Sequence, residues 1–151
     1  ECFVEDTLAI LKEYDFPPSQ LWIEITERCR DLPISMIKKT VTAFREAGIH
    51  ITMDDYGTGS SSSQMMLELP VEGIKIDMFF VKDILEEKKK QALVIGMINF
   101  ANAADLRICI EGIENDSLES YLRQFDVTCF QGYHYSKPIC QDELMKLLIK
   151  P

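Results

Sequence analysis

Hydrophobic and polar positions alternate in five short runs along the chain, and longer amphipathic segments separate these runs. Alternation over 4–8 residues is typical of β-strands, whereas a period near 3.6 residues is typical of helices. The short runs predict strands at 21–26, 49–54, 73–77, 107–111 and 127–131. The longer segments predict helices at 4–14, 34–47, 61–68, 81–104, 116–124 and 141–149. Strands that alternate with helices indicate an α/β fold with a parallel sheet and helices packed outside it.

Each predicted strand has one apolar face and one face with a polar or ionisable residue near its C-terminal end. Because successive side chains of a strand point to opposite faces, Glu24 lies opposite Ile23 and Ile25, and Lys75 lies opposite Ile74. An open sheet covered by helices on both faces would bury such polar groups at a high cost. In a TIM-type (β/α)8 barrel, inward-facing residues at the C-terminal ends of the strands line the site instead. The pattern therefore predicts a barrel.

Five strand–helix units are too few to close a barrel of this type, which takes eight units and roughly 250 residues. The chain has 151 residues, of which 46% are hydrophobic, and no linker-like stretch divides it. We therefore expect one domain spanning 1–151, with the N-terminal strands of the barrel missing. The chain begins at Glu1 rather than at a methionine, so we expect it to be a piece of a longer parent protein.

The net charge and the cysteine content limit which binding partners and which cellular compartment are expected. The net charge of −9 argues against duplex nucleic acid or an anionic membrane as a direct partner. Five scattered cysteines without a C-x-x-C pair predict reduced thiols and a cytoplasmic location, and Cys109 and Cys129 are expected to be small core residues. The apolar stretch 92–104 is too short to span a bilayer, so we expect no membrane segment in this chain, whereas the parent could be membrane-anchored.

The inward-facing polar residues are mostly carboxylates. The full set is Glu24, Asp54, Lys75, Glu111 and Gln131, with Asp55 beside Asp54. Carboxylates that converge on one rim repel one another unless cations lie among them. Hard oxygen ligands suit Mg²⁺ or Mn²⁺, and such sets hold two cations roughly 3.5–4 Å apart in phosphoester hydrolysis. Taken alone, the Asp54–Asp55 pair fits a helix N-cap or a turn equally well.

Five sequence motifs follow one another in a fixed order. They are Glu-Ile-Thr-Glu at 24–27, Asp-Asp-Tyr-Gly-Thr-Gly-Ser-Ser-Ser at 54–62, Leu-Pro-Val-Glu-Gly-Ile-Lys-Ile-Asp at 69–77, Ile-Glu-Gly-Ile-Glu at 110–114 and Gln-Gly-Tyr-His-Tyr-Ser-Lys-Pro at 131–138. Together they resemble the EAL domain, a bacterial phosphodiesterase domain that opens cyclic di-GMP to linear pGpG. The resemblance extends over nearly the whole chain.

The resemblance implies a role for each matching residue. The implied ligands of the two Mg²⁺ or Mn²⁺ ions are Glu24, Asp54, Asp55 and Glu111. Lys75 would hold or polarise the attacking water or the phosphate, and Gln131 would orient water or ligand. Glu27 corresponds to the glutamate that anchors the loop 56–63, which in the family couples the metal site to a homodimer interface. The implied reaction is in-line attack of a metal-activated hydroxide on one phosphodiester bond.

The sequence also departs from the family pattern. The Glu-Ala-Leu triplet that names the family is absent, as is the Asn-bearing strand that follows it, and Ser60 and Ser63 replace an aromatic residue and a leucine. We therefore expect the parent to be the enzyme and this chain to be inactive alone. Two other functions stay open: a non-catalytic cyclic di-GMP receptor and a dimerising signalling module. The resemblance further implies upstream sensory or GGDEF-type domains in the parent.

Overall fold

The computed structural model describes residues 2–26, 32–58 and 62–149. Within these residues, the helices are α1 (Cys2–Glu13), the 3-10 helix η1 (Pro18–Gln20), α2 (Ile34–Glu46), α3 (Ser62–Glu68), α4 (Met78–Val81), α5 (Lys88–Ala103), α6 (Asp116–Leu122) and α7 (Gln141–Leu148). The strands are β1 (Trp22–Thr26), β2 (His50–Tyr56), β3 (Gly73–Ile76), β4 (Arg107–Ile110) and β5 (Cys129–Phe130).

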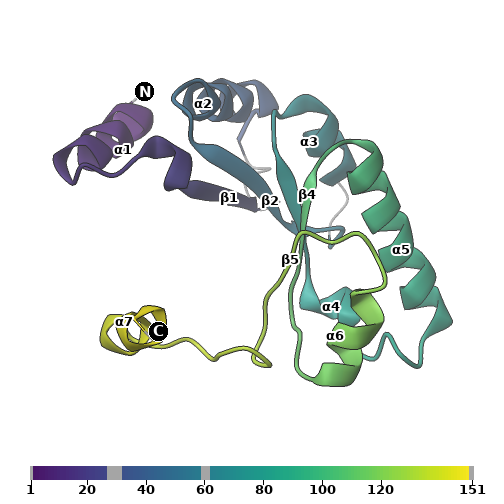
Figure 1. The fold of residues 1–151 in the computed structure, drawn as a ribbon. Helices are drawn as coiled ribbons and strands as arrows, with labels where there is room; N and C mark the ends of the chain where they lie inside the picture. The colour runs from purple at the N-terminus through teal and green to yellow at the C-terminus, as the bar shows by residue number, and fades with distance from the viewer. Residues whose placement is uncertain (1, 27–31, 59–61, 150–151) are drawn as a thin grey trace.

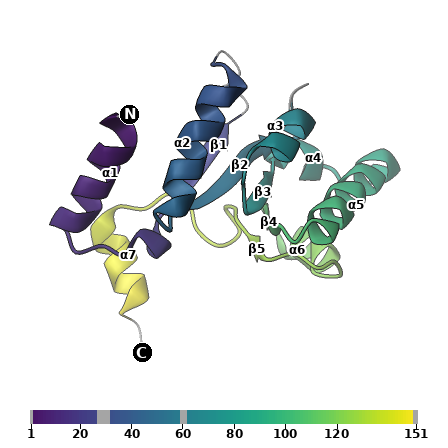
Figure 2. The same cartoon turned by 90° about the horizontal axis from the view of Figure 1, so that it is seen from above.

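The five strands form one sheet in the sequence order β1-β2-β3-β4-β5, and every neighbouring pair is parallel. Helices α2, α3, α5 and α6 follow one another in an arc around the outside of this sheet, while α1 and α7 stand apart from it (Figure 1). The view from above shows the same succession of strands and helices (Figure 2). This arrangement is an incomplete α/β barrel, as the alternating pattern predicts.

The two faces of the sheet differ in burial as the strand pattern predicts. Ile25, Ile51, Ile74 and Ile108 point outward under the helices and are at most 7% exposed. The inner face carries polar and thiol side chains, of which Thr52 and Lys75 on the central strands are buried and Trp22, Arg107 and Cys129 on the outer strands are exposed. The expectation that Cys129 is a core residue is therefore wrong, because its side chain is exposed.

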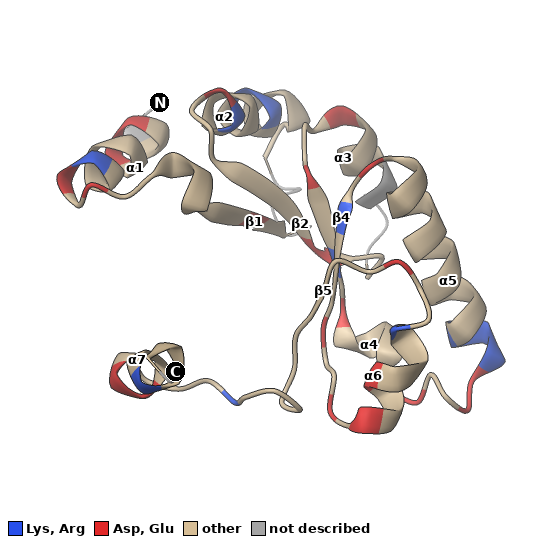
Figure 3. Ribbon diagram, in the orientation of Figure 1, with Lys and Arg blue, Asp and Glu red and all other residues tan. Residues whose placement is uncertain are grey.

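The single helix expected at 81–104 is interrupted. The short helix α4 begins after Asp77, whose carboxylate accepts a hydrogen bond from the Phe79 backbone N–H at 2.7 Å. A turn then separates α4 from α5, and Asp83 within it has a left-handed backbone with φ of 60°. The three lysines at 88–90 form the first turn of α5 and appear as its basic end in Figure 3. Hydrophobic periodicity continues through this turn because Ile84 packs into the same core as the helices.

The C-terminal helix α7 is exposed along its whole length, including the apolar residues Leu144, Met145, Leu147 and Leu148. No helix among the described residues is both long enough and apolar enough to cross a bilayer.

Candidate functional site

The site expected at the rim of the sheet is organised around the Lys75 side chain. Its Nζ lies 2.9 Å from Glu24 Oε1, 3.2 Å from Asp54 Oδ1 and 2.8 Å from Glu111 Oε1. These contacts join four strand ends, because the carboxylates lie on or just after β1, β2 and β4 and the lysine lies on β3. Figure 3 shows acidic and basic residues meeting where these strands end. Strand parity alone therefore identified a cluster that the fold brings together.

Lys75 is held as a charged group. Its side chain is 9% exposed, and burial by itself lowers the pKa of a lysine because it disfavours the ammonium form. The hydrogen bonds to Glu111 and Glu24 and the charge of Glu111 outweigh this loss of solvation, so the pKa of Lys75 lies above its ordinary value. The carboxylates around Lys75 therefore favour its charged ammonium form in the metal-free chain.

A β-bulge explains how two consecutive aspartates contribute to one site. Met53 pairs with Ile74 and Tyr56 pairs with Ile76, so Asp54 and Asp55 on β2 both face the single residue Lys75 on β3. Asp55 has a left-handed backbone with φ of 54°. A regular strand would send adjacent side chains to opposite faces, whereas a bulge re-aims one of them.

Three carboxylates converge closely enough to share a cation. One oxygen each of Asp54, Asp55 and Glu111 lies within 4.8 Å of the others, and all three residues are half-buried. The Oδ1 atom of Asp54 is buried and, although it is paired with the Lys75 charge at 3.2 Å, accepts no hydrogen bond from the described residues. A buried carboxylate oxygen without a hydrogen-bond donor is costly unless a ligand satisfies it. The oxygen-only donor set suits Mg²⁺ or Mn²⁺.

Glu24 and Gln131 occupy the edges of this arrangement. Glu24 is 49% exposed and joins the three carboxylates through Lys75, outside their 4.8 Å grouping. Gln131 follows β5, and its backbone N–H donates to Ile110 O at 2.9 Å. Both residues line a cavity of about 310 Å³ on the inner face of the sheet together with Lys75. Glu27, the residue expected to anchor the loop, lies outside the described residues.

Strand parity places further lining residues of this cavity on the inner face but predicts no role for them. Trp22, Thr52, Cys109 and Cys129 line it beside the expected set. The period-2 pattern predicts their face, because it puts them on the same side of their strands as Glu24 and Lys75. A carboxylate at such a position indicates a candidate metal ligand, whereas a threonine or a thiol at the same kind of position does not indicate one function.

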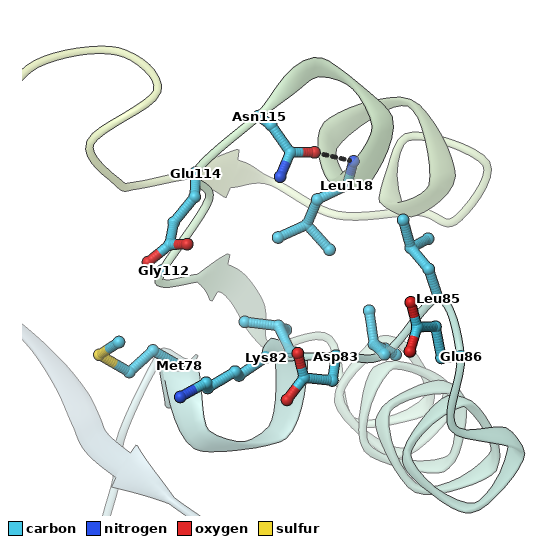
Figure 4. Close-up of a pocket in the computed structure, with 11 residues that line it drawn as sticks. Met78, Lys82, Asp83, Leu85, Glu86, Gly112, Glu114, Asn115 and Leu118 are labelled. Carbon is cyan, nitrogen blue, oxygen red and sulfur yellow. Dashed lines mark hydrogen bonds between the residues drawn. The ribbon is translucent and has the colours of Figure 1, made fainter.

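Two other features lie away from this rim. A hollow of about 230 Å³ between α4 and α6 is bordered by Lys82, Asp83 and Glu114, with Asn115 Oδ1 accepting a hydrogen bond from the Leu118 N–H at 3.0 Å (Figure 4). His134 Nε2 lies 3.1 Å from Glu119 Oε2 and 3.4 Å from Asp116 Oδ1. Glu119 also forms an ion pair with Arg123, so these side chains make a polar network beside α6.

Comparison with known proteins places the chain in one family. The pattern of the EAL domain matches residues 1–138. The cyclic di-GMP phosphodiesterase PA2567 of Pseudomonas aeruginosa is 30% identical over 142 residues, which are 94% of this chain and 24% of that protein. The chain spans about a fifth of the length of the first curated relatives that it matches.

Solved structures agree with this assignment. The EAL domain of Mycobacterium smegmatis DcpA superposes with a TM-score of 0.92 at 32% identity, over 98% of this chain and 66% of that one. The EAL enzyme Bd1971, in a form bound to cAMP and cyclic di-GMP, gives a TM-score of 0.91 at 31% identity, over 97% of this chain and 39% of that one. The chain therefore belongs to the EAL domain family.

Proposed function

We propose that this chain is part of a metal-dependent phosphodiesterase that hydrolyses cyclic di-GMP to linear pGpG. The observation that carries the proposal is the convergence of Asp54, Asp55 and Glu111, whose oxygens lie within 4.8 Å of one another beside a buried lysine. Membership of the EAL domain family and a relative named as a cyclic di-GMP phosphodiesterase support this substrate.

The balance of charge at the rim supports a cation site. Lys75 supplies one positive charge against the carboxylates of Glu24, Asp54 and Glu111, so the group keeps an excess of negative charge even before Asp55 is added. Such an excess in a half-buried place favours bound cations. We propose that Asp54, Asp55 and Glu111, with Glu24 at the edge, hold two Mg²⁺ or Mn²⁺ ions.

Each residue of the site has a chemical task in this proposal. Bound divalent cations supply Lewis-acid chemistry, since they lower the pKa of water and neutralise phosphate charge. Lys75 keeps its carboxylate partners in place and offers a fixed positive charge to a phosphate oxygen. Gln131 lines the same cavity, and a side-chain amide can donate a hydrogen bond to a phosphate or water oxygen and accept one from water.

The decisive experiment follows pGpG formation by chromatography. This chain and its full-length parent are incubated with cyclic di-GMP, with and without Mn²⁺ or Mg²⁺. We expect metal-dependent turnover by the parent and none by this chain alone, because this chain spans only part of its relatives' solved domains. Asp54→Asn in the parent removes turnover, whereas Asp105→Asn, an exposed control, keeps it. Binding of cyclic di-GMP without turnover by the parent would instead indicate a receptor, and no binding a signalling module.

We also propose a homodimer contact near the loop that follows Asp55. Residues 59–61 of this loop lie outside the described part of the chain. The helix that follows, α3, presents Leu67 with 82% of its surface exposed. We expect Leu67→Gln to shift the parent from dimer to monomer in analytical ultracentrifugation, and an unchanged dimer would contradict this contact.

A further inference from the structure

The inner face of the sheet carries two thiols side by side. Cys109 on β4 is paired in register with Cys129 on β5, and paired residues of neighbouring parallel strands point to the same face. Both side chains line the 310 Å³ cavity that also contains Lys75 and Gln131. Neither cysteine is in a disulfide.

The spacing of the two strands suits a covalent bond between these thiols. Neighbouring strands lie about 4.8 Å apart, which falls within the roughly 4.4–6.8 Å between Cα atoms that disulfides span. The Cβ atoms of a disulfide lie closer than those of side-by-side strand residues, so the bond would draw β4 and β5 together by about 1 Å. A disulfide under such strain is readily reduced and belongs to the labile kind.

The two thiols differ in access. Cys129 is exposed, whereas Cys109 is half-buried beside it. Only two residues of β5 are strand, and among the described residues this strand pairs with β4 alone. Because Cys129 is the more exposed thiol, an oxidant reacts with it first. Cys109 is the neighbouring thiol that can then attack the oxidised sulfur.

We propose that Cys109 and Cys129 are a redox modification site that forms a reversible disulfide across β4 and β5. A peroxide breaks its O–O bond on the Cys129 sulfur, which gives a sulfenic acid and one water. The Cys109 sulfur then attacks the Cys129 sulfur. The S–S bond forms, the S–O bond breaks, and the hydroxyl leaves as a second water with the Cys109 proton. Two thiols and one hydrogen peroxide thus give one disulfide and two waters, and a thiol reductant reverses the oxidation.

The bond would lie directly below two residues of the proposed site. Glu111 follows Cys109 by two residues and Gln131 follows Cys129 by two residues, each directly after the end of its strand, so we expect oxidation to restrict the spacing between Glu111 and Gln131. Formation of the bond does not rest on the proposed function. Trp22, the only tryptophan of the chain, lines the same cavity and provides an optical signal.

The test uses the full chain with Cys2, Cys29 and Cys140 replaced by serine. After treatment with hydrogen peroxide, we expect the intact mass of the monomer to fall by the mass of two hydrogen atoms in mass spectrometry. Dithiothreitol should return the mass to that of the untreated chain. Arg123 lies between the two cysteines, so trypsin separates their peptides unless a disulfide joins them. We also expect the Trp22 emission to change on oxidation and to return on reduction.

Two variants keep the result interpretable. In the same background, Cys129→Ser and Cys109→Ser each remove the cross-linked peptide and the reversible change in Trp22 emission. The proposal is overturned if dimedone labels a persistent sulfenic acid on Cys129 while no cross-link forms. It is equally overturned if the disulfide joins two chains, seen as a dimer on a non-reducing gel.

Discussion

Lys75 Nζ lies 2.8 Å from Glu111 Oε1 and joins the ends of β3 and β4 by a charge-assisted hydrogen bond. The same ammonium contacts Asp54 and Glu24, so one buried cation holds three acidic groups that would otherwise repel one another. Removing one partner of a buried ion pair leaves the other charges uncompensated, which costs more than the pair itself contributes.

Lys75→Met is therefore expected to destabilise the metal-free chain by about 3 kcal/mol in urea denaturation. The variant keeps the volume of the side chain and removes its charge. Lys38→Met on the exposed surface of α2 is the matched control and should change the free energy of unfolding by less than about 0.5 kcal/mol. Mn²⁺ should restore part of the lost stability in the Lys75 variant. Equal stabilities of the two variants would contradict the central role of this lysine.

Asp55→Asn is expected to weaken Mn²⁺ binding at least tenfold in isothermal titration calorimetry, because it removes one of three converging carboxylates. Asparagine adopts the left-handed backbone at least as readily as aspartate, so the variant should keep its fold. Asp105→Asn is a close control, since Asp105 has the same φ of 54° and is exposed. If both variants bind Mn²⁺ like the unchanged chain, Asp55 is not a ligand.

The alternation of side chains along each strand predicts most of the residues that meet at the C-terminal ends of the strands, because the side-chain period of a regular strand is fixed. Lys75 and Glu111 meet as expected, and the apolar residues opposite them are buried. The bulge at Asp54 and Asp55 could not be predicted, since it depends on how β2 pairs with β3 and not on the sequence of β2 alone. The exposure of Cys129 likewise depends on what covers the inner face.

Gly132→Ala is expected to destabilise the chain by about 2 kcal/mol, because a Cβ at this position would overlap the backbone of Ile113. The backbone cannot yield as a flexible side chain would, so the turns that follow Glu111 and Gln131 would have to move. Gly96→Ala tests the opposite case, since nothing lies within 4 Å of its added Cβ in α5. We expect that variant to be more stable by about 0.5–1 kcal/mol, measured by the same denaturation.

Arg123→Gln is expected to make the melting temperature fall less steeply as the pH is lowered into the acid range. Hydrogen bonds from Arg123 and Tyr135 hold the pKa of Glu119 below its ordinary value of 4.5. A carboxyl with a lowered folded-state pKa contributes its stability fully above the unfolded value and loses it as the pH falls through the folded-state value. The melting temperature of the unchanged chain should thus fall more steeply below pH 4.5 than that of the variant.

This difference should shrink in high salt, because the ion pair between Glu119 and Arg123 is screened by solvent. His134 contacts Glu119 at 3.1 Å and is unchanged in the variant. Lys146→Gln on the exposed helix α7 is the charge-matched control and should follow the unchanged chain. Parallel profiles for all three proteins would contradict a stabilising role of the Glu119–Arg123 pair.

The extra residue of β2 restricts position 55 in two independent ways. Asp55 absorbs this residue in a left-handed backbone, which only glycine, asparagine and aspartate adopt routinely. Glutamate would keep the negative charge but lacks this conformational preference, and glycine would keep the conformation but lacks the charge. Among the twenty amino acids, aspartate alone meets both demands. The identity of this residue therefore suits both the left-handed backbone of the bulge and the ligand role proposed for it, so a substitution that keeps only one of these properties is expected to be costly.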